Sequence, residues 1–205
     1  MAHALLVFAH PLQDSFCAAI AARASAALTA AGHTVDRLDL YAEAFQPCLT
    51  AGERRAYYGE PPDVTGDITG HTSGVADAVA RLRAAGKLVL VFPQWWFGMP
   101  AILKGWIDRV FQPGVAFRHT PGYGQILPCL DNIDSVLTIT TLGSPWWVAE
   151  LYMRNPVRRQ IRSGIVGPCT RSARFRMLNC YHAEKLSDAR REAFLARVDK
   201  AAGAL

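Results

Sequence analysis

Three short, largely apolar runs, separated by helical patterns, most constrain how this chain can fold. They are Ala4–Ala9, Lys87–Phe92 and Asp134–Thr140. Runs of this length are typical of strands that are buried on both faces, as in a parallel sheet covered by helices. They fall far short of the roughly 20 apolar residues that a membrane-spanning helix requires. We therefore expect a parallel sheet in a globular protein, with no stable insertion into a membrane.

Helical patterns and two further strand patterns fill the intervals between these runs. A helix that Asp14 or Ser15 can cap follows the first run, and a helix that Pro100 can open follows the second. Strands are also predicted at Thr34–Leu38 and Phe175–Tyr181, whereas segment 39–74 is predicted to be irregular. The remaining helical patterns are Val75–Leu82, part of Trp147–Ser163, and Ser187–Ala202. This alternation predicts an α/β fold, as a single domain over residues 1–205.

Charge and cysteine content narrow the class of partner. The net charge of +5 and an isoelectric point near 9.1 suit an anionic cofactor or cosubstrate. Nucleic acid is not expected, because the sequence lacks zinc-finger, recognition-helix and aromatic–basic sheet signatures. The five cysteines are odd in number and none are spaced as CxxC, so neither a disulfide framework nor a metal site is predicted. Reduced thiols, and the lack of a basic segment before the first apolar run, predict a cytoplasmic protein.

The loop after the first strand is a candidate anion site. In a doubly wound sheet, ligands bind at the carboxyl ends of the strands, and this loop leads directly into a helix N-terminus. His10 and Ser15 can add side-chain donors for a phosphate or diphosphate. The loop contains neither GxGxxG nor a Walker lysine. An ordinary strand-to-helix turn with a structural histidine is the alternative.

The loops after the other two apolar strands carry aromatic and small polar residues. Trp95, Trp96 and Phe97 could form a flat surface on which a planar ring stacks. One or two of them could instead pack on helices, and we expect at least one to do so. Thr140 and Thr141 offer hydroxyl groups in the third loop. The same loop adds the amide of Gly143 and the flat side chains of Trp146 and Trp147. Together the three loops predict a flavin nucleotide site.

Three segments of the chain carry a family resemblance. They are AHPLQDSF, FPQWWFGMPAILKGWIDRVFQPGVAF and ITTLGSPWW. They resemble the NAD(P)H:quinone oxidoreductases, the DT-diaphorase-like group of flavodoxin-like flavoproteins, and the shorter bacterial branch is the closer match. The resemblance implies a three-layer sandwich with a five-stranded parallel sheet in the order 2-1-3-4-5. It also implies tightly bound FAD, or FMN in some relatives, and a homodimer with active sites at the subunit interface.

The resemblance also implies which residues contact the flavin and the acceptor. The flavin positions are His10, Ser15, Phe16, Cys17, Pro93, Gln94, Trp95, Trp96, Phe97, Asp108, Thr140, Thr141, Leu142 and Gly143. The backbone of Trp96 and Phe97 would lie near the reactive nitrogen, and Asp108 would reach the partner subunit's cofactor. Cys17 and Leu142 replace a common asparagine and glycine. The acceptor would be walled by Trp146, Trp147 and Phe117.

The implied reaction is a two-electron, ping-pong transfer of hydride from NAD(P)H through FAD to a quinone or related aromatic acceptor. In the animal enzymes a tyrosine and a histidine are proposed to relay charge, but Val148 and Arg154 stand at those positions here. No catalytic residue is therefore assigned, because the flavin carries the chemistry. One alternative is a soluble ancillary subunit of a potassium-efflux transporter. Another is a one-electron carrier of the flavodoxin type, although such carriers are usually acidic.

An arginine-rich segment follows the third loop. Residues 154–176 contain seven arginines and no acidic residue. Guanidinium groups bind phosphate in a bidentate manner, so the segment could recognise the 2′-phosphate of NADPH. A solvated face or a dimer contact would have the same composition.

Overall fold

The computed structural model describes residues 2–56, 75–122 and 124–205. Its centre is a five-stranded parallel sheet with the order β2-β1-β3-β6-β7. The strands are β1 (His3–Phe8), β2 (Thr34–Asp39), β3 (Lys87–Pro93), β6 (Ser135–Thr141) and β7 (Arg174–Cys180). The predicted strand order 2-1-3-4-5 is confirmed, with β6 and β7 as the fourth and fifth predicted strands.

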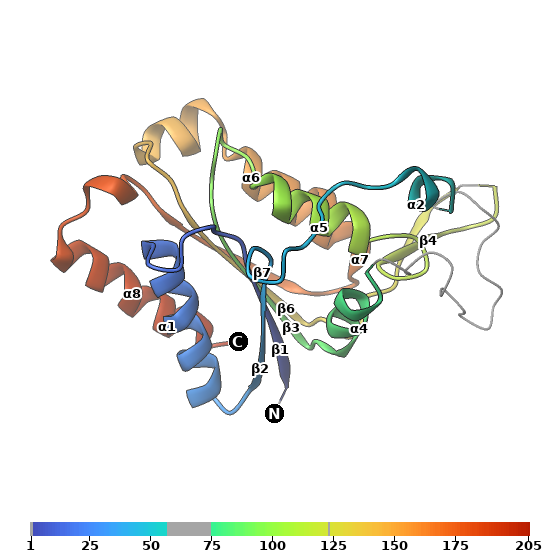
Figure 1. Ribbon diagram of the computed structural model, residues 1–205, viewed down its shortest axis with the longest axis horizontal. Helices are drawn as coiled ribbons and strands as arrows, with labels where there is room; N and C mark the ends of the chain where they lie inside the picture. Colours follow the sequence, from blue (N-terminus) through green and yellow to red (C-terminus); the bar gives the residue numbers. More distant parts are fainter. Residues whose placement is uncertain (1, 57–74, 123) are drawn as a thin grey trace.

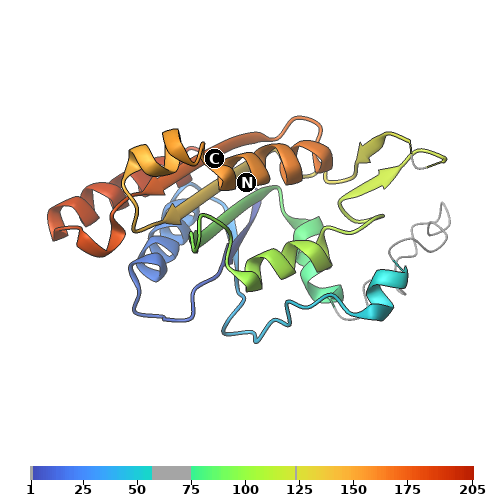
Figure 2. The same ribbon diagram turned by 90° about the horizontal axis from the view of Figure 1, so that it is seen from above.

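Helices cover both faces of the sheet (Figure 1), and Figure 2 shows the same arrangement from above. On one face lie α1 (Phe16–Ala30) and α8 (Asp188–Ala202). On the other lie α4 (Ala76–Ala84), α5 (Ala101–Val110), α6 (Pro156–Arg159), the π-helix η2 (Gln160–Val166) and α7 (Gly167–Cys169). Among the described residues, the remaining short helices are α2 (Ala51–Ala56), η1 (Val148–Tyr152) and η3 (Ala183–Lys185). The predicted three-layer sandwich is confirmed.

Successive side chains of β1 point to opposite faces of the sheet and so contribute to two separate halves of the core. Leu5 and Val7 pack with the helices of one face, whereas Leu6 and Phe8 pack with α1 and α8 on the other. All four side chains are fully buried. This is why a continuous apolar run, rather than an alternating one, marks the strand. Among the described residues, no helix is long and apolar enough to cross a bilayer.

The helix predicted within part of Trp147–Ser163 is present, but it is divided in two. The chain forms the π-helix η1, then breaks at Arg154 and Asn155, both with positive φ. Pro156 begins α6, where its missing N–H costs no hydrogen bond. The side chain of Asn155 caps the new helix by accepting from the Arg158 N–H at 3.0 Å.

Two further elements were not predicted. A hairpin of β4 (Phe117–His119) and β5 (Ile126–Pro128) lies between α5 and β6, and each of its strands is too short to show a period. Helix α2 lies in the segment predicted to be irregular, and the rest of that segment, 57–74, is outside the described residues. A capping box opens α2, because the Glu53 N–H donates to Thr50 Oγ1 at 3.1 Å and the Thr50 N–H donates to Glu53 Oε2 at 2.7 Å.

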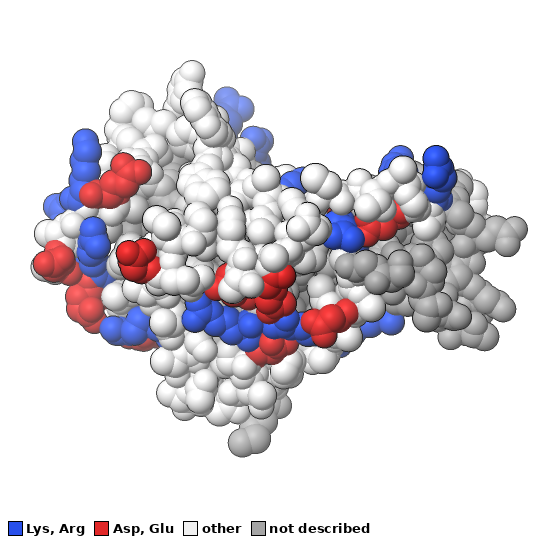
Figure 3. All heavy atoms as spheres, viewed as in Figure 1, with Lys and Arg blue, Asp and Glu red and all other residues white. Residues whose placement is uncertain are grey.

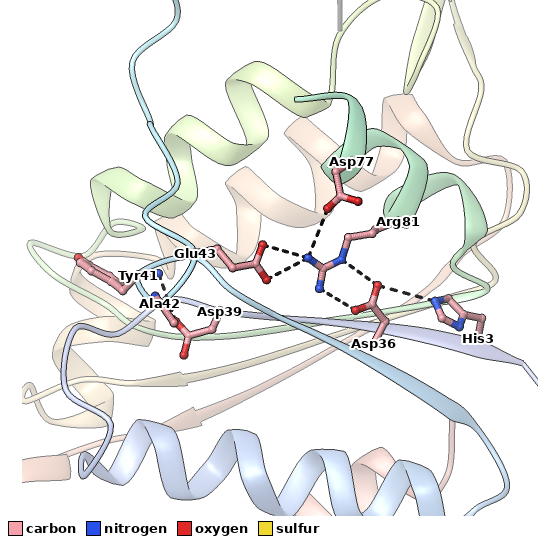
Figure 4. A network of polar contacts seen from close by, with 8 residues as sticks. All are labelled: His3, Asp36, Asp39, Tyr41, Ala42, Glu43, Asp77 and Arg81. Atoms are coloured by element: carbon pink, nitrogen blue, oxygen red, sulfur yellow. Dashed lines mark hydrogen bonds and ion pairs between the residues drawn. The ribbon is translucent and has the colours of Figure 1, made fainter. Parts of the chain in front are cut away.

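An ion-pair network fastens α4 to the edge strand β2 (Figure 4). The Arg81 guanidinium donates to both carboxylate oxygens of Asp36, at 2.9 and 2.6 Å, and to Glu43 at 3.0 Å. This side chain is 17% exposed, so the bidentate pair is better shielded from water than an ordinary surface ion pair. Elsewhere on the face drawn in Figure 3, acidic and basic side chains are intermixed rather than gathered by sign.

Gly105 allows the chain before α2 to pack directly on α5. A Cβ atom at this position would lie 2.2 Å from the Pro47 carbonyl oxygen and 2.3 Å from Pro47 Cβ. Arg109, one turn along α5, fixes the same segment by donating to the Gln46 carbonyl oxygen at 2.5 Å and to Glu53 at 2.6 Å. The glycine in the AILKGW segment therefore has a packing role.

We predict that Gly105→Ala destabilises the protein by about 1–3 kcal/mol, because overpacking outweighs the helix propensity of alanine. Urea unfolding followed by circular dichroism measures the change. Gly164→Ala is the matched control, since a Cβ at that helical glycine would meet nothing within 4 Å. Equal stability of Gly105→Ala and the parent would show that the contact with Pro47 is loose.

Candidate functional site

The three predicted loops meet at one edge of the sheet. They follow β1, β3 and β6, which are consecutive in the sheet and parallel, so their carboxyl ends lie together. Backbone hydrogen bonds join the loop bases, from the Ala9 N–H to the Val91 carbonyl at 3.0 Å and from the Gln94 N–H to the Thr141 carbonyl at 2.7 Å. The edge is the position at which such folds bind ligands.

In the first loop, Ser15 and His10 each make a local contact. Ser15 caps α1 as predicted, since its hydroxyl accepts from the Ala18 N–H at 3.1 Å. His10 Nδ1 lies 3.0 Å from the Leu12 amide nitrogen and 3.2 Å from the Leu12 carbonyl oxygen, a local contact of the kind expected for a structural histidine. Nε2 of the same ring takes no part in this contact, so it is the ring nitrogen left for a ligand beside the helix N-terminus.

Cys17 lies in the first turn of α1 and is 3% exposed. Burial raises the pKa of its thiol to about 12, and a hydrogen bond with Thr141 opposes the rise only in part. The thiol is therefore neutral at physiological pH, and it adds no negative charge to a site suited to an anion. Phe16, beside it, is half-buried against Phe194, with ring centroids 6.2 Å apart.

The second loop contains a strained turn. Trp96 and Phe97 have φ values of 52° and 54°, and the Gly98 N–H donates to the Trp95 carbonyl at 2.9 Å to close the turn. Left-handed backbone is unusual for bulky side chains and tends to occur at functional positions. Trp96 is 99% exposed and Trp95 43% exposed. The alternative in which aromatics of this loop pack on helices therefore does not describe these two tryptophans.

In the third loop, buried and exposed residues separate sharply. Thr140 and Leu142 are buried, and Thr140 Oγ1 donates to Asn179 Oδ1 at 2.8 Å. That hydroxyl supports the loop from behind instead of facing solvent. Trp146 and Trp147 are both more than half exposed. The loop thus offers its tryptophans and the exposed Gly143 to a ligand.

Asp108 and Phe117 lie apart from the three loops in this chain. Both line a cavity of ≈ 540 Å³ beside α5, and residues of the three loops do not take part in its lining. The Asp108 carboxylate accepts from Lys104 Nζ at 2.5 and 2.7 Å. A single copy of the chain therefore does not bring these two predicted residues to the site.

Three arginines of the arginine-rich segment lie away from the loops. Arg162, Arg171 and Arg174 line a hollow of ≈ 380 Å³ next to the first residue of β7. That is the amino edge of the sheet, about 20 Å from its carboxyl edge for strands of this length. Arg171 is paired with Asp131 at 3.1 Å. Within one chain, the placement of these three arginines favours a solvated or contact face over recognition of the 2′-phosphate.

Sequence reasoning missed three polar residues behind the loops, Glu150, Asn179 and Tyr181. Asn179 is paired in register with Thr140 across β6 and β7. Its side chain also donates to Glu150 at 2.9 Å and to the Tyr181 hydroxyl at 3.2 Å. Such long-range contacts leave no local signal in the sequence. Among the described residues, no group of three His, Cys, Asp or Glu side chains could hold a metal ion.

Comparison with known proteins decides the family. Residues 2–200 match the family model described as flavodoxin-like fold. The chain belongs to this family. It is 31% identical over 166 residues to the "Ribosyldihydronicotinamide dehydrogenase (quinone)" of Homo sapiens, covering 77% of this chain and 69% of that protein. This relationship confirms the resemblance to the quinone oxidoreductases.

Two further similarities extend the comparison. The chain is 37% identical over 152 residues to the "NAD(P)H dehydrogenase (quinone) 1" of Rattus norvegicus, covering 69% of this chain but only 54% of the rat protein. The match thus spans about half the length of that relative. The crystal structure of Smu.1420 from Streptococcus mutans UA159 superposes with a TM-score of 0.83 and 28% identity, covering 99% of this chain and 100% of that one.

We predict that Cys17 resists alkylation in the folded protein, because a thiol with a pKa near 12 is almost entirely protonated at pH 8. The exposed Cys48 provides the internal control. Iodoacetamide treatment at pH 8 followed by peptide mass spectrometry should label Cys48 and leave Cys17 unmodified until the protein is denatured. Labelling of both cysteines at similar rates would contradict the buried, neutral thiol.

Proposed function

We propose that this protein is an NAD(P)H:quinone oxidoreductase that binds FAD and transfers two electrons to a quinone or related aromatic acceptor. The observation that carries the proposal is the strained turn at Trp96 and Phe97, which exposes aromatic rings beside an anion-compatible helix N-terminus. The similarity to the two dehydrogenases named above, both described as acting with quinone, also supports it.

The residues present fit a flavin nucleotide. His10 Nε2 lies outside the contact with Leu12, and the first turn of α1 carries N–H groups without helical acceptors, so both suit a diphosphate. The turn at Trp96 places backbone groups of the second loop at the same edge, where the ring of the cofactor would bind. FAD is proposed rather than FMN on the family resemblance.

Bound FAD would supply the chemistry of two-electron transfer from NAD(P)H to the acceptor. The chain's own residues bind and orient the reactants. Trp146 and Trp147, both more than half exposed, would form the flat wall against which nicotinamide and quinone bind in turn. Gln94 and Thr140, both buried and hydrogen-bonded at 2.8 Å, would hold the second and third loops at a fixed separation.

The proposal includes a homodimer with shared sites. Trp96, Trp146, Leu151 and Tyr152 all expose more than half of their surface. Clustered apolar exposure on this scale is characteristic of interaction surfaces, and a twofold contact buries both copies at once. Asp108 and Phe117, which lie away from the loops of their own chain, would then be available to the partner's site.

The proposal also covers the domain content, the cellular location and the partners of the protein. We propose one flavin-binding domain that acts in the cytoplasm, with quinone or related aromatic compounds as partners and no role in nucleic-acid binding. The preference between NADPH and NADH is not part of the proposal, because the arginine hollow lies at the opposite edge. The relatives named above are dehydrogenases, which favours an enzyme over an ancillary transporter subunit.

The proposed function predicts that the purified protein binds about one FAD per chain and that, without oxygen, it sustains NAD(P)H oxidation beyond one equivalent per flavin only when menadione is present. Absorption spectroscopy and mass spectrometry of the released cofactor measure the binding, and the decrease in NAD(P)H absorbance measures turnover. Reconstitution with FMN serves as the comparison. Failure to bind either flavin would overturn the proposed function.

We predict that His10→Ala weakens flavin binding about 10- to 100-fold, the equivalent of one hydrogen bond to a charged group, or about 1.5–3 kcal/mol. Fluorescence titration of the apoprotein measures the affinity. His33→Ala, beyond the opposite end of α1, is the matched control and should bind as the parent does. Unchanged affinity in His10→Ala would show that His10 does not contribute to flavin binding and has only its structural contact with Leu12.

The homodimer predicts a mass of about twice the 22.4 kDa of the chain in light scattering at micromolar concentration. Trp96→Asp should shift the mass toward the monomer, because a charge would be buried at the proposed interface. Lys200→Asp, on α8, provides a control for the added acidic group. A monomer with full quinone reductase turnover would show that each site is complete within one chain.

A further inference from the structure

Behind the second and third loops, polar side chains from four segments form one hydrogen-bonded chain. Glu150 on η1 accepts from the Tyr181 hydroxyl at 2.5 Å and from Asn179 Nδ2 at 2.9 Å. Asn179 Oδ1 accepts from Thr140 Oγ1 at 2.8 Å. Gln94 Nε2 donates to Thr140 Oγ1 at 2.8 Å and lies 3.4 Å from Asn179 Oδ1. This series of hydrogen bonds therefore connects the carboxylate of Glu150 to Gln94, which immediately precedes Trp95.

The charge state of Glu150 is set by its neighbours. Partial burial raises the pKa of Glu150, but hydrogen bonds from Tyr181, Asn155 and Asn179, with the nearby positive charge of Arg158, outweigh it, so the pKa lies below its usual range. Burial and the adjacent carboxylate raise the pKa of Tyr181 to about 12. At neutral pH, Glu150 is an anion that only accepts and Tyr181 is a neutral donor.

An acceptor-only carboxylate fixes the direction of every later bond. Asn179 must turn its NH₂ group to Glu150 and its carbonyl oxygen to Thr140. The Thr140 hydroxyl proton is then used, so its oxygen accepts from Gln94. Both N–H bonds of Gln94 thus point into the network, and its carbonyl oxygen remains for contacts outside it. Gln94 and Thr140 are at most 9% exposed, so water competes little for these groups.

We propose that Glu150 is a positioning residue for the flavin site, which orients the Gln94 carboxamide through Asn179 and Thr140 and adds a fixed negative charge behind the second loop. This inference rests on the proposed function. In this proposal, the charge of Glu150 contributes to the electrostatic potential around the flavin ring. A negative charge behind the site disfavours added electron density, so the parent holds a bound flavin at a lower reduction potential than a neutral network would.

The test compares Glu150→Gln with the parent in two measurements. Glutamine keeps the shape, removes the charge and no longer dictates which way Asn179 points. In the FAD-loaded protein, we expect the ratio of reduced to oxidised flavin at a fixed potential to rise about tenfold, or about 30 mV for two electrons. In the flavin-free protein, we expect the side-chain amide NMR signals of Gln94 and Asn179 to shift and exchange faster with water.

Two further variants separate the effect of the Glu150 charge from the effect of the hydrogen bonds. Glu192→Gln removes an exposed carboxylate of α8 that pairs with Arg23 of α1, so neither measurement should change. Asn179→Ala keeps the charge but interrupts the chain, so the Gln94 amide signals should change as in Glu150→Gln while the potential moves less. This variant also carries the test if Glu150→Gln does not fold.

The outcomes distinguish this inference from the proposed function. Failure of every variant and of the parent to bind flavin would overturn the proposed function, while the amide signals would still test the orientation of Gln94. Normal flavin binding with an unchanged potential in Glu150→Gln would overturn the electrostatic role. Gln94 signals that are the same in Glu150→Gln, Asn179→Ala and the parent would overturn the positioning role.

Discussion

Every residue of β3 and β6 is buried, and the two strands pair in parallel from Lys87 with Ser135 to Pro93 with Thr141. Because neither strand has an exposed face, a slip in register would bury polar groups without partners. The last pair fixes where the second and third loops leave the sheet, and the bond from the Gln94 N–H to the Thr141 carbonyl extends the register by one residue. The geometry of the candidate site depends on this pairing.

The loops beyond that pairing depart from what stability alone favours. Two consecutive bulky residues, Trp96 and Phe97, have positive φ, and Trp96 is almost fully exposed. Strain and apolar exposure of this kind are retained where binding requires them. The rigid strands and the buried hydrogen bond between Gln94 and Thr140 support the turn from behind. The buried strands thus stabilise the fold, while the backbone strain is confined to the turn that follows β3.

How far the sequence predicts the structure follows from the range of the interactions involved. The strands and the Ser15 cap are predicted because apolar runs and caps are local features. The break at Asn155 is not predicted, because the positive φ values of Arg154 and Asn155 leave no periodic pattern of apolar residues in the sequence. The same holds for Asn179, which is 85 residues from Gln94 and touches it only through the sheet register.

The proposed function requires that the three loops hold a flavin that carries electrons in pairs. Anaerobic titration of the FAD-loaded protein measures this property. We expect that one equivalent of NAD(P)H per flavin bleaches the visible absorption and that one equivalent of menadione restores it in a single two-electron step. Stepwise reoxidation by one-electron acceptors, with no reaction with menadione, would overturn the proposed two-electron transfer and indicate an electron carrier.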